Sequence, residues 1–172
     1  MSKTQINILF TAVGNQKTKE GKCKIGNVTE IIENETHPYP INQDEEIYER
    51  IKPDIVYLFV TKDSVDNARE IYNIYKDRED VEILVQPENC FTTDENEIIH
   101  YTNAYDFTAT VQSFYSMKTK VMNLIKNAQP CNHPLSLKKE HIVKKVSSDQ
   151  PEIKFFVNLT AGTKIVSAAA SV

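Results

Sequence analysis

The side chains best suited to bind an anion lie near the end of this 172-residue chain, in the stretch 154–172. A short apolar run at 155–157 predicts a buried strand, and a turn and a helix start follow it, with the polar residues Thr160, Gly162, Thr163 and Lys164. Hydroxyl donors and a positive point charge suit phosphate or ribose oxygens, and a helix start adds free N–H groups. A simpler role explains the same residues, with Thr160 or Thr163 as helix cap and Lys164 solvated.

A second candidate site follows the first apolar run, where 6–11 is predicted as a strand and 12–16 as a turn. Ligands of an open α/β sheet bind outside the carboxyl ends of its strands. Thr11, Gly14 and Asn15 therefore fall where a ligand would lie, although an ordinary strand-to-loop turn also explains them. Neither site has the spacing G-x-x-x-x-G-K-[ST] or G-x-G-x-x-G, so P-loop nucleotide triphosphatases and NAD-type dinucleotide binding are not indicated.

The elements that must position these sites alternate along the chain. Further strands are predicted at 54–60 and 81–85, and helices at 44–52, from about 65 to 75, and at 108–127 with Asp106 as N-cap. The segment 28–33 suits a short strand or a helical turn, and 129–150 reads as an exposed excursion. The core stripe of the long helix is predicted as Phe107, Val111, Phe114, Val121 and Ile125. This alternation predicts an α/β, Rossmann-like fold with a mainly parallel sheet and helices on both faces.

Lysines gather in two polar segments. Lys17, Lys19, Lys22 and Lys24 lie in the polar stretch 17–40, which is typical of a solvated loop but could also close over an anion. The pairs at 138–139 and 144–145 are interpreted as a solvated face rather than a binding patch.

The composition narrows the class of protein. The length indicates one domain, and a net charge of −4 argues against duplex nucleic-acid binding, which needs a basic face. No signal peptide or membrane span is evident, so a cytoplasmic location is expected. Cys23, Cys90 and Cys131 support neither a disulfide framework nor a zinc site, and no cofactor or metal is expected.

Four stretches together carry a family resemblance. They are I-L-F-T-A-V-G-N at the first strand, K-P-D-I-V-Y-L-F-V-T-K-D at the second, Y-D-F before the long helix, and N-L-T-A-G-T-K-I-V-S-A-A at the last turn. The last is similar to the pattern N-x-T-G-G-T-K-x-M-x-x-A. In this order they resemble the CARF family, the CRISPR-associated Rossmann-fold domains of type III CRISPR systems. Ala161 replaces the usual second glycine and could narrow the approach of a ligand, Val166 stands where methionine is common, and 17–40 is an unusually long insertion.

The resemblance implies a homodimer whose two crevices face each other across a two-fold axis. Together they would bind one cyclic oligoadenylate, the second messenger made when the CRISPR complex detects foreign RNA. A ring of phosphates can be gripped by two equivalent turns without a basic charge overall. The ligand-binding residues expected from the motif match are Thr11, Ala12, Gly14, Asn15, Thr61, Asn158, Thr160, Ala161, Gly162, Thr163 and Lys164.

In this family the domain usually precedes an effector, often a HEPN ribonuclease marked by R-x-x-x-x-H. That spacing is absent, because isoleucines stand five residues after Arg50, Arg69 and Arg78. The chain also stops inside an apolar helix pattern at Val172. We therefore expect 1–172 to be a single ligand-sensing domain from a longer protein whose C-terminal effector is absent.

Three functions stay open at this point. The first is a sensor that binds cyclic oligoadenylate and controls the effector. The second is a metal-independent ring nuclease, in which the ribose 2′-OH attacks the neighbouring phosphate, Thr11 positions it and Lys164 stabilises the developing charge. No well-placed histidine is evident as a general base, which counts against this second function. The third is the sensing part of a CRISPR transcriptional regulator. Ring size, four or six adenylates, is not encoded in side-chain types.

Overall fold

The computed structural model describes residues 4–40, 50–127, 135–158 and 164–170. Four parallel strands in the order β5-β1-β3-β4 form the sheet, and the short strand β2 adds to the β5 edge in antiparallel direction. The strands are β1 (Gln5–Ala12), β2 (Tyr39–Pro40), β3 (Ile55–Phe59), β4 (Glu82–Gln86) and β5 (Glu152–Asn158). The predicted α/β, Rossmann-like fold with a mainly parallel sheet is confirmed.

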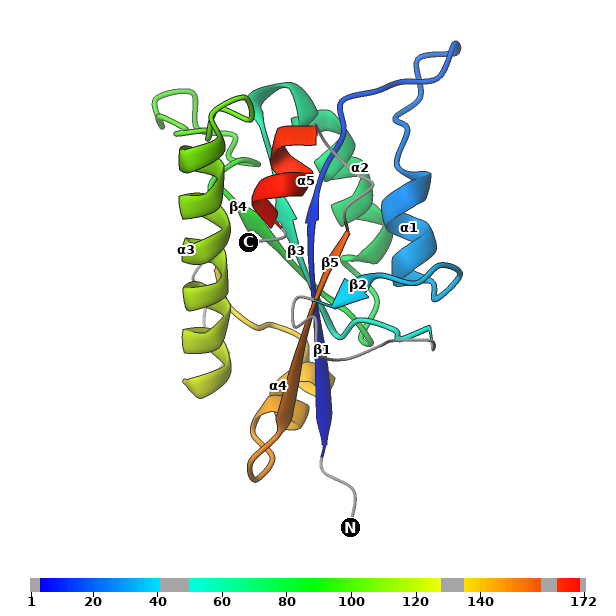
Figure 1. Cartoon of the computed structure of the whole chain (residues 1–172), viewed down its shortest axis with the longest axis vertical. Helices are drawn as coiled ribbons and strands as arrows, with labels where there is room; N and C mark the ends of the chain where they lie inside the picture. The colour runs from blue at the N-terminus through cyan, green and yellow to red at the C-terminus, as the bar shows by residue number, and fades with distance from the viewer. Residues whose placement is uncertain (1–3, 41–49, 128–134, 159–163, 171–172) are drawn as a thin grey trace.

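Helices cover both faces of this sheet (Figure 1). Helices α3 (Phe107–Lys126) and α5 (Lys164–Ala170) lie on one side, where Phe59 stacks on Phe114 with ring centroids 5.1 Å apart. Helices α1 (Gly26–Ile32) and α2 (Val65–Tyr75) lie on the other. All five residues of β3 are consequently buried, as its continuous apolar sequence predicts for a strand covered on both faces.

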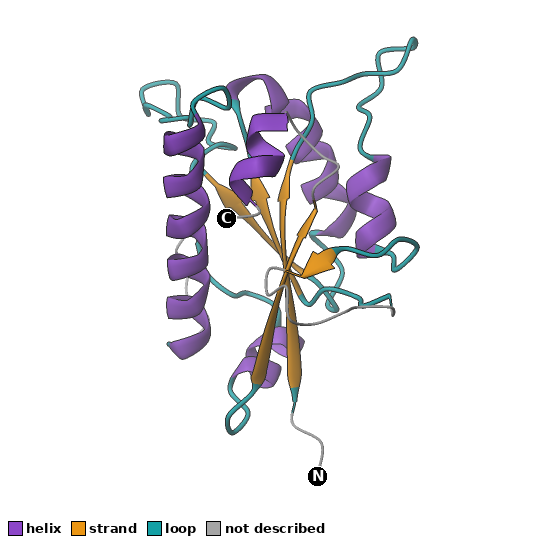
Figure 2. Ribbon diagram, viewed as in Figure 1, coloured by secondary structure: helices purple, strands orange, loops and turns teal. Residues whose placement is uncertain are grey.

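The strand order creates a crevice at one end of the sheet. The chain steps outward from β1 to β3 and β4, and then returns to place β5 on the other side of β1. The connections that leave β1 and β5 therefore run to opposite faces, and such a switch point opens a crevice at the carboxyl ends of the strands. Figure 2 shows these ends fanning out beneath the upper helices and loops.

The core stripe of α3 differs in part from the prediction. Phe114, Val121 and Ile125 are buried, whereas Val111 is half-buried and Phe107 is 48% exposed. Phe107 lies in the first turn, which extends past the strand tips in Figure 1, so the sheet does not cover it. Thr110 and Met117, both fully buried, complete the stripe instead. The predicted N-cap is confirmed, because the Asp106 carboxylate accepts a 3.0 Å hydrogen bond from Ala109 N.

Other boundaries shift by small amounts. The ambiguous segment at 28–33 is the helix α1, and the predicted helix at 44–52 lies mostly outside the described residues. Among the described helices, none is long and apolar enough to cross a membrane.

The prediction of an exposed excursion at 129–150 is wrong for its described part, 135–150. This segment contains α4 (Glu140–Val146), which buries Ile142 and Val146. Lys145 is not simply solvated, because its Nζ lies 2.7 Å from Asp54 Oδ1. The other Asp54 oxygen accepts a 2.8 Å hydrogen bond from Asn7 N, which ties α4 to the amino ends of β1 and β3.

A buried carboxylate anchors the start of the same segment. Glu82 is 3% exposed, and its two oxygens accept hydrogen bonds from Lys138 N at 2.7 Å and Lys139 N at 3.0 Å. Burial raises the pKa of Glu82, while the two N–H groups oppose that rise. The Glu82 carboxyl therefore fixes residues 138–139 against β4. No local sequence pattern predicts this contact.

We expect Glu82→Ala to lower the free energy of unfolding by about 1–3 kcal/mol, because two backbone donors lose their acceptor. Chemical denaturation followed by circular dichroism measures the change. Since the folded pKa of Glu82 is raised, its contribution is greatest at low pH and declines as pH rises through the folded pKa. The exposed Glu79 provides the control, and Glu79→Ala should change stability by less than about 0.5 kcal/mol. Equal losses in the two variants would contradict the anchoring role.

Candidate functional site

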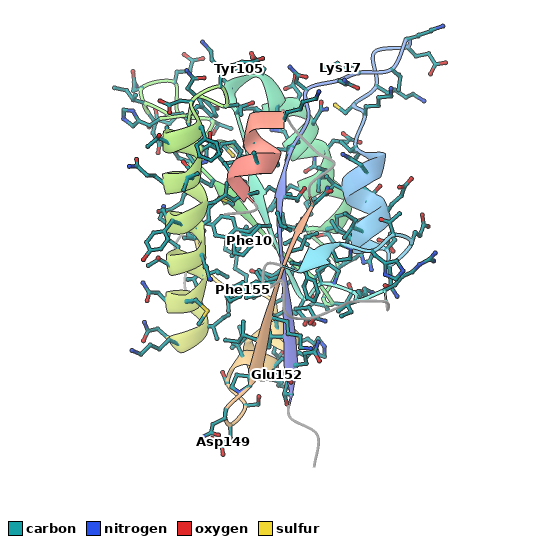
Figure 3. The ribbon with its side chains drawn as sticks, in the orientation of Figure 1. Phe10, Lys17, Tyr105, Asp149, Glu152 and Phe155 are labelled. Atoms are coloured by element: carbon teal, nitrogen blue, oxygen red, sulfur yellow. The ribbon has the colours of Figure 1, made fainter. Side chains whose placement is uncertain are left out.

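A cavity of about 840 Å³ lies at the carboxyl ends of β1 and β3. Its walls come from 12–16, 24–30, 59–63 and 101–105, together with Val166 of α5. In Figure 3, Lys17 and Tyr105 mark this end of the molecule, whereas Asp149 and Glu152 mark the opposite end. The volume is in the range of small-molecule sites, and the position is the one that an open α/β sheet uses for ligands.

Four of the residues predicted from the sequence line this cavity, namely Ala12, Gly14, Asn15 and Thr61. Gly14 contributes empty space, because a Cβ added there would meet no atom within 4 Å. Its backbone is not in the left-handed region, so the fold does not require glycine at this position for conformational reasons. The absence of a side chain at position 14 therefore enlarges the cavity.

Thr11 and Asn158 lie behind this wall and are not among the lining residues. They are paired across β1 and β5, and Asn158 Nδ2 donates to Thr11 Oγ1 at 3.1 Å. The Thr11 hydroxyl donates in turn to Ala12 O at 2.9 Å. Both side chains are buried, with exposed fractions of 0% and 3%. Their hydrogen bond therefore joins β1 and β5 beneath the crevice instead of facing a ligand.

The last turn is only partly described. Thr160, Ala161, Gly162 and Thr163 lie outside the described residues. Lys164 begins α5 and is exposed. Val166, 2% exposed, brings the first turn of α5 to the cavity wall.

The lysine cluster that follows β1 forms a hairpin rather than an irregular loop. Thr18 N donates to Lys22 O at 2.7 Å, and Lys24 N donates to Gln16 O at 2.9 Å. Gly21 supplies the positive φ of 81° that its tip requires. The 17–24 hairpin projects from the carboxyl end of the sheet in Figure 1, and Lys24 at its base lines the cavity.

Helix α2 holds the base of this hairpin. Asn67 is 1% exposed, and its Nδ2 donates to Gln16 O at 3.0 Å. Lys17 Nζ lies 3.4 Å from Asp66 Oδ2. The contacts of Asn67 and Asp66 on α2 therefore fix the direction in which the hairpin projects from the domain.

The charges that line the cavity are mixed. Lys24 and Lys62 are cationic, and Glu30 and Asp63 are anionic. Amide groups lie among them on Asn15, Gln16, Asn27 and Asn103. Such a lining suits a ligand that carries both anionic oxygens and hydrogen-bond donors, such as a nucleotide, better than it suits bare phosphate.

On two of these walls, at 24–30 and 101–105, sequence reasoning chose no ligand-binding residue. It named Lys24 only as part of a lysine cluster that could close over an anion, and Tyr105 only as part of the stretch Y-D-F. The second wall is a turn built just before α3, because Asn103 Oδ1 accepts from Tyr105 N at 2.9 Å and Asn103 O accepts from Asp106 N at 3.0 Å. Asn103 followed three residues later by a helix cap is a recognisable turn signal. This signal predicts the turn itself, but it does not predict that the turn borders the crevice.

The described lining contains no histidine or cysteine. Cys90 is buried near this end, and burial raises its pKa to about 12, so its thiol stays protonated at neutral pH. Burial also raises the pKa of Tyr101, which lines the cavity. No group of three or more His, Cys, Asp or Glu that could hold a metal occurs within the described ranges.

Comparison with known proteins adds no relative. No protein-family model matches the sequence, and neither a curated protein nor a solved structure matches the chain.

Proposed function

We propose that this domain is a sensor that binds a cyclic oligoadenylate second messenger at a dimer interface and controls a C-terminal effector nuclease in a type III CRISPR system. One observation carries the proposal: Ala12, Gly14, Asn15 and Thr61, chosen from the sequence, lie together on the 840 Å³ cavity at the carboxyl ends of β1 and β3. The resemblance of four sequence stretches to CARF domains supplies the identity of the ligand.

The cavity chemistry supports a nucleotide ligand. Lys24 and Lys62 can pair with phosphate oxygens, and the amides can donate to ribose or base acceptors. Glu30 and Asp63 can accept from ribose hydroxyls or from exocyclic amino groups of bases. A ring of alternating phosphates, riboses and adenines presents all of these groups.

The homodimer is supported by an apolar row on α3. Phe107, Tyr115 and Met122 are 48%, 75% and 37% exposed, and their spacing places them on one side of the helix. Beside this row, a hollow of about 250 Å³ lies between α3 and α5 and is lined mainly by apolar side chains, including Tyr115 and Ala170. Exposed apolar surface of this kind is typical of protein interfaces, and a two-fold axis would let each row cover the other.

The burial and hydrogen bonding of the Thr11 hydroxyl favour the sensor over the ring nuclease. Its hydroxyl is fully buried and engaged with Asn158 and Ala12, so a direct role in positioning a ribose oxygen is poorly supported. The described cavity lining also lacks a histidine that could act as general base. Cleavage of the ligand is therefore an outcome of the test rather than a second proposal.

The test is calorimetric titration of the chain with cyclic tetra-adenylate and cyclic hexa-adenylate, followed by chromatography of the ligand. We expect tight binding of one of the two rings, at one ring per two chains, with the ligand recovered intact. Linear products would replace the sensor with the ring nuclease. Failure of both rings to bind would overturn the proposal.

We expect Lys164→Ala to weaken binding of the cyclic oligoadenylate by about 1–3 kcal/mol, the scale for losing a charged hydrogen bond. Calorimetry of the variant measures the change. Lys126, exposed at the far end of α3, provides the control, and Lys126→Ala should leave affinity unchanged. Unchanged affinity in Lys164→Ala would remove Lys164 from the site.

A further inference from the structure

Tyr105 occupies an unusual place for a large aromatic side chain. It lies between β4 and α3, among the residues that line the cavity, yet 75% of its surface is exposed. Figure 3 shows it at the carboxyl end of the sheet. A residue that both lines the cavity and faces solvent stands at the mouth of the cavity.

The backbone that carries Tyr105 is held by hydrogen bonds on both sides. Tyr105 N donates to Asn103 Oδ1 at 2.9 Å, and Asp106 N donates to Asn103 O at 3.0 Å. Asp106 then caps α3 through its 3.0 Å bond from Ala109 N. The ring is thus presented by a turn whose backbone is already fixed, so binding through it costs little additional order.

Core packing does not account for this placement. Fully burying an aromatic side chain would stabilise the fold, whereas Tyr105 leaves most of its surface in water. The neighbouring Tyr101 shows the contrast, because it also lines the cavity but packs against the hydrophobic core. Exposed tyrosines at a binding site are suited to contact a planar group, since the ring is large, rigid and amphipathic.

We infer that Tyr105 stacks on a nucleobase of the bound ligand and makes the 101–105 wall the base-binding end of the cavity. Aromatic stacking is the usual way in which proteins hold unpaired bases, and purines offer the larger face. The phosphates of the same ligand would then extend toward Lys24 and Lys62 on the other walls. The inference rests on the proposed function because it takes the ligand to be a nucleotide. It does not require the nucleotide to be cyclic.

The experiment compares adenosine 5′-monophosphate, ribose 5-phosphate and cyclic tetra- and hexa-adenylate on the wild-type chain, three Tyr105 variants and one control variant. In Tyr105→Phe we expect wild-type affinity for the adenine-containing ligands, because the stacking face is kept. In Tyr105→Leu and Tyr105→Ala we expect about a tenfold loss or more, and no change for ribose 5-phosphate, which has no base. Ile98→Ala is the matched control, since Ile98 is 72% exposed in the same connection and does not line the cavity.

The outcomes separate this inference from the proposed function. Ring binding that is unaffected in Tyr105→Ala would overturn the inference and leave the sensor standing. Binding of the mononucleotide alone, with the expected dependence on Tyr105, would overturn the sensor and support the inference. Equal losses in Tyr105→Phe and Tyr105→Ala would assign the effect to the hydroxyl and overturn stacking. Failure of every adenine-containing ligand to bind would overturn both.

Discussion

Gly14→Trp is expected to weaken binding of the proposed ligand, a cyclic oligoadenylate, at least about 100-fold, or roughly 2.7 kcal/mol, while the unfolding temperature stays unchanged. The reason is geometric. Position 14 lines the cavity, a Cβ there meets nothing within 4 Å, and the backbone is in a region open to any residue. An indole would therefore occupy ligand space without straining the fold. Calorimetry gives the affinity, and thermal unfolding checks the fold.

Two controls sharpen this prediction. Gly14→Ala adds only a methyl group at the same position and should cost less than tenfold in affinity. Gly26→Ala also adds a methyl group at the cavity wall, where its Cβ would meet Glu30 Oε1 at an ordinary contact of 3.9 Å. The chain has no tryptophan, so the introduced indole also reports by its fluorescence whether ligand still approaches. Wild-type affinity in Gly14→Trp would place the ligand elsewhere.

Tyr115→Arg is expected to convert the proposed homodimer to a monomer, with the mass in solution falling from twice 19.7 kDa to 19.7 kDa. Tyr115 is 75% exposed and borders the apolar hollow between α3 and α5. Two copies related by a two-fold axis would bring two guanidinium groups into one apolar interface, where each charge would be desolvated and repelled by the other. Light scattering coupled to size-exclusion chromatography measures the mass.

The matched control places the same charge on the other face of the domain. Ile74 on α2 is 45% exposed, and Ile74→Arg should leave the dimer intact. If both variants remain dimeric, the α3 row is not the interface. If the wild-type chain is a monomer even with ligand bound, the dimer itself is wrong, and the ligand would have to be held by one crevice.

Much of the fold follows from local sequence signals. The apolar run of β3 between Asp54 and Thr61 predicts a strand covered on both faces, and its alternation with helical periods predicts parallel crossovers. The segment that contains α4 could not be predicted in this way. Its order depends on Glu82 and Asp54, which bond to residues 56 to 91 positions away, and its lysine- and serine-rich sequence resembles a loop.

Residues on two walls of the candidate site, 12–16 and 59–63, were predicted from the sequence, and those on the other walls were not. The carboxyl-end rule places the residues after β1 correctly, because it depends only on strand direction. Thr11 is the exception. The strand runs one residue further than the predicted 6–11, to Ala12, so Thr11 is not its last residue. It pairs with Asn158 inside the sheet and does not reach the cavity lining. The walls at 24–30 and 101–105 come from chain segments whose meeting depends on the whole topology.

The pairing of Asp54 with Lys145 and Asn7 has a consequence for engineering this domain. These contacts close the amino ends of the strands, whereas the cavity occupies the carboxyl ends. Substitutions far apart and without shared partners usually combine additively. Substitutions that improve packing around α4 should therefore raise the unfolding temperature without altering ligand selectivity. Substitutions around the cavity could then change ligand selectivity in the stabilised domain.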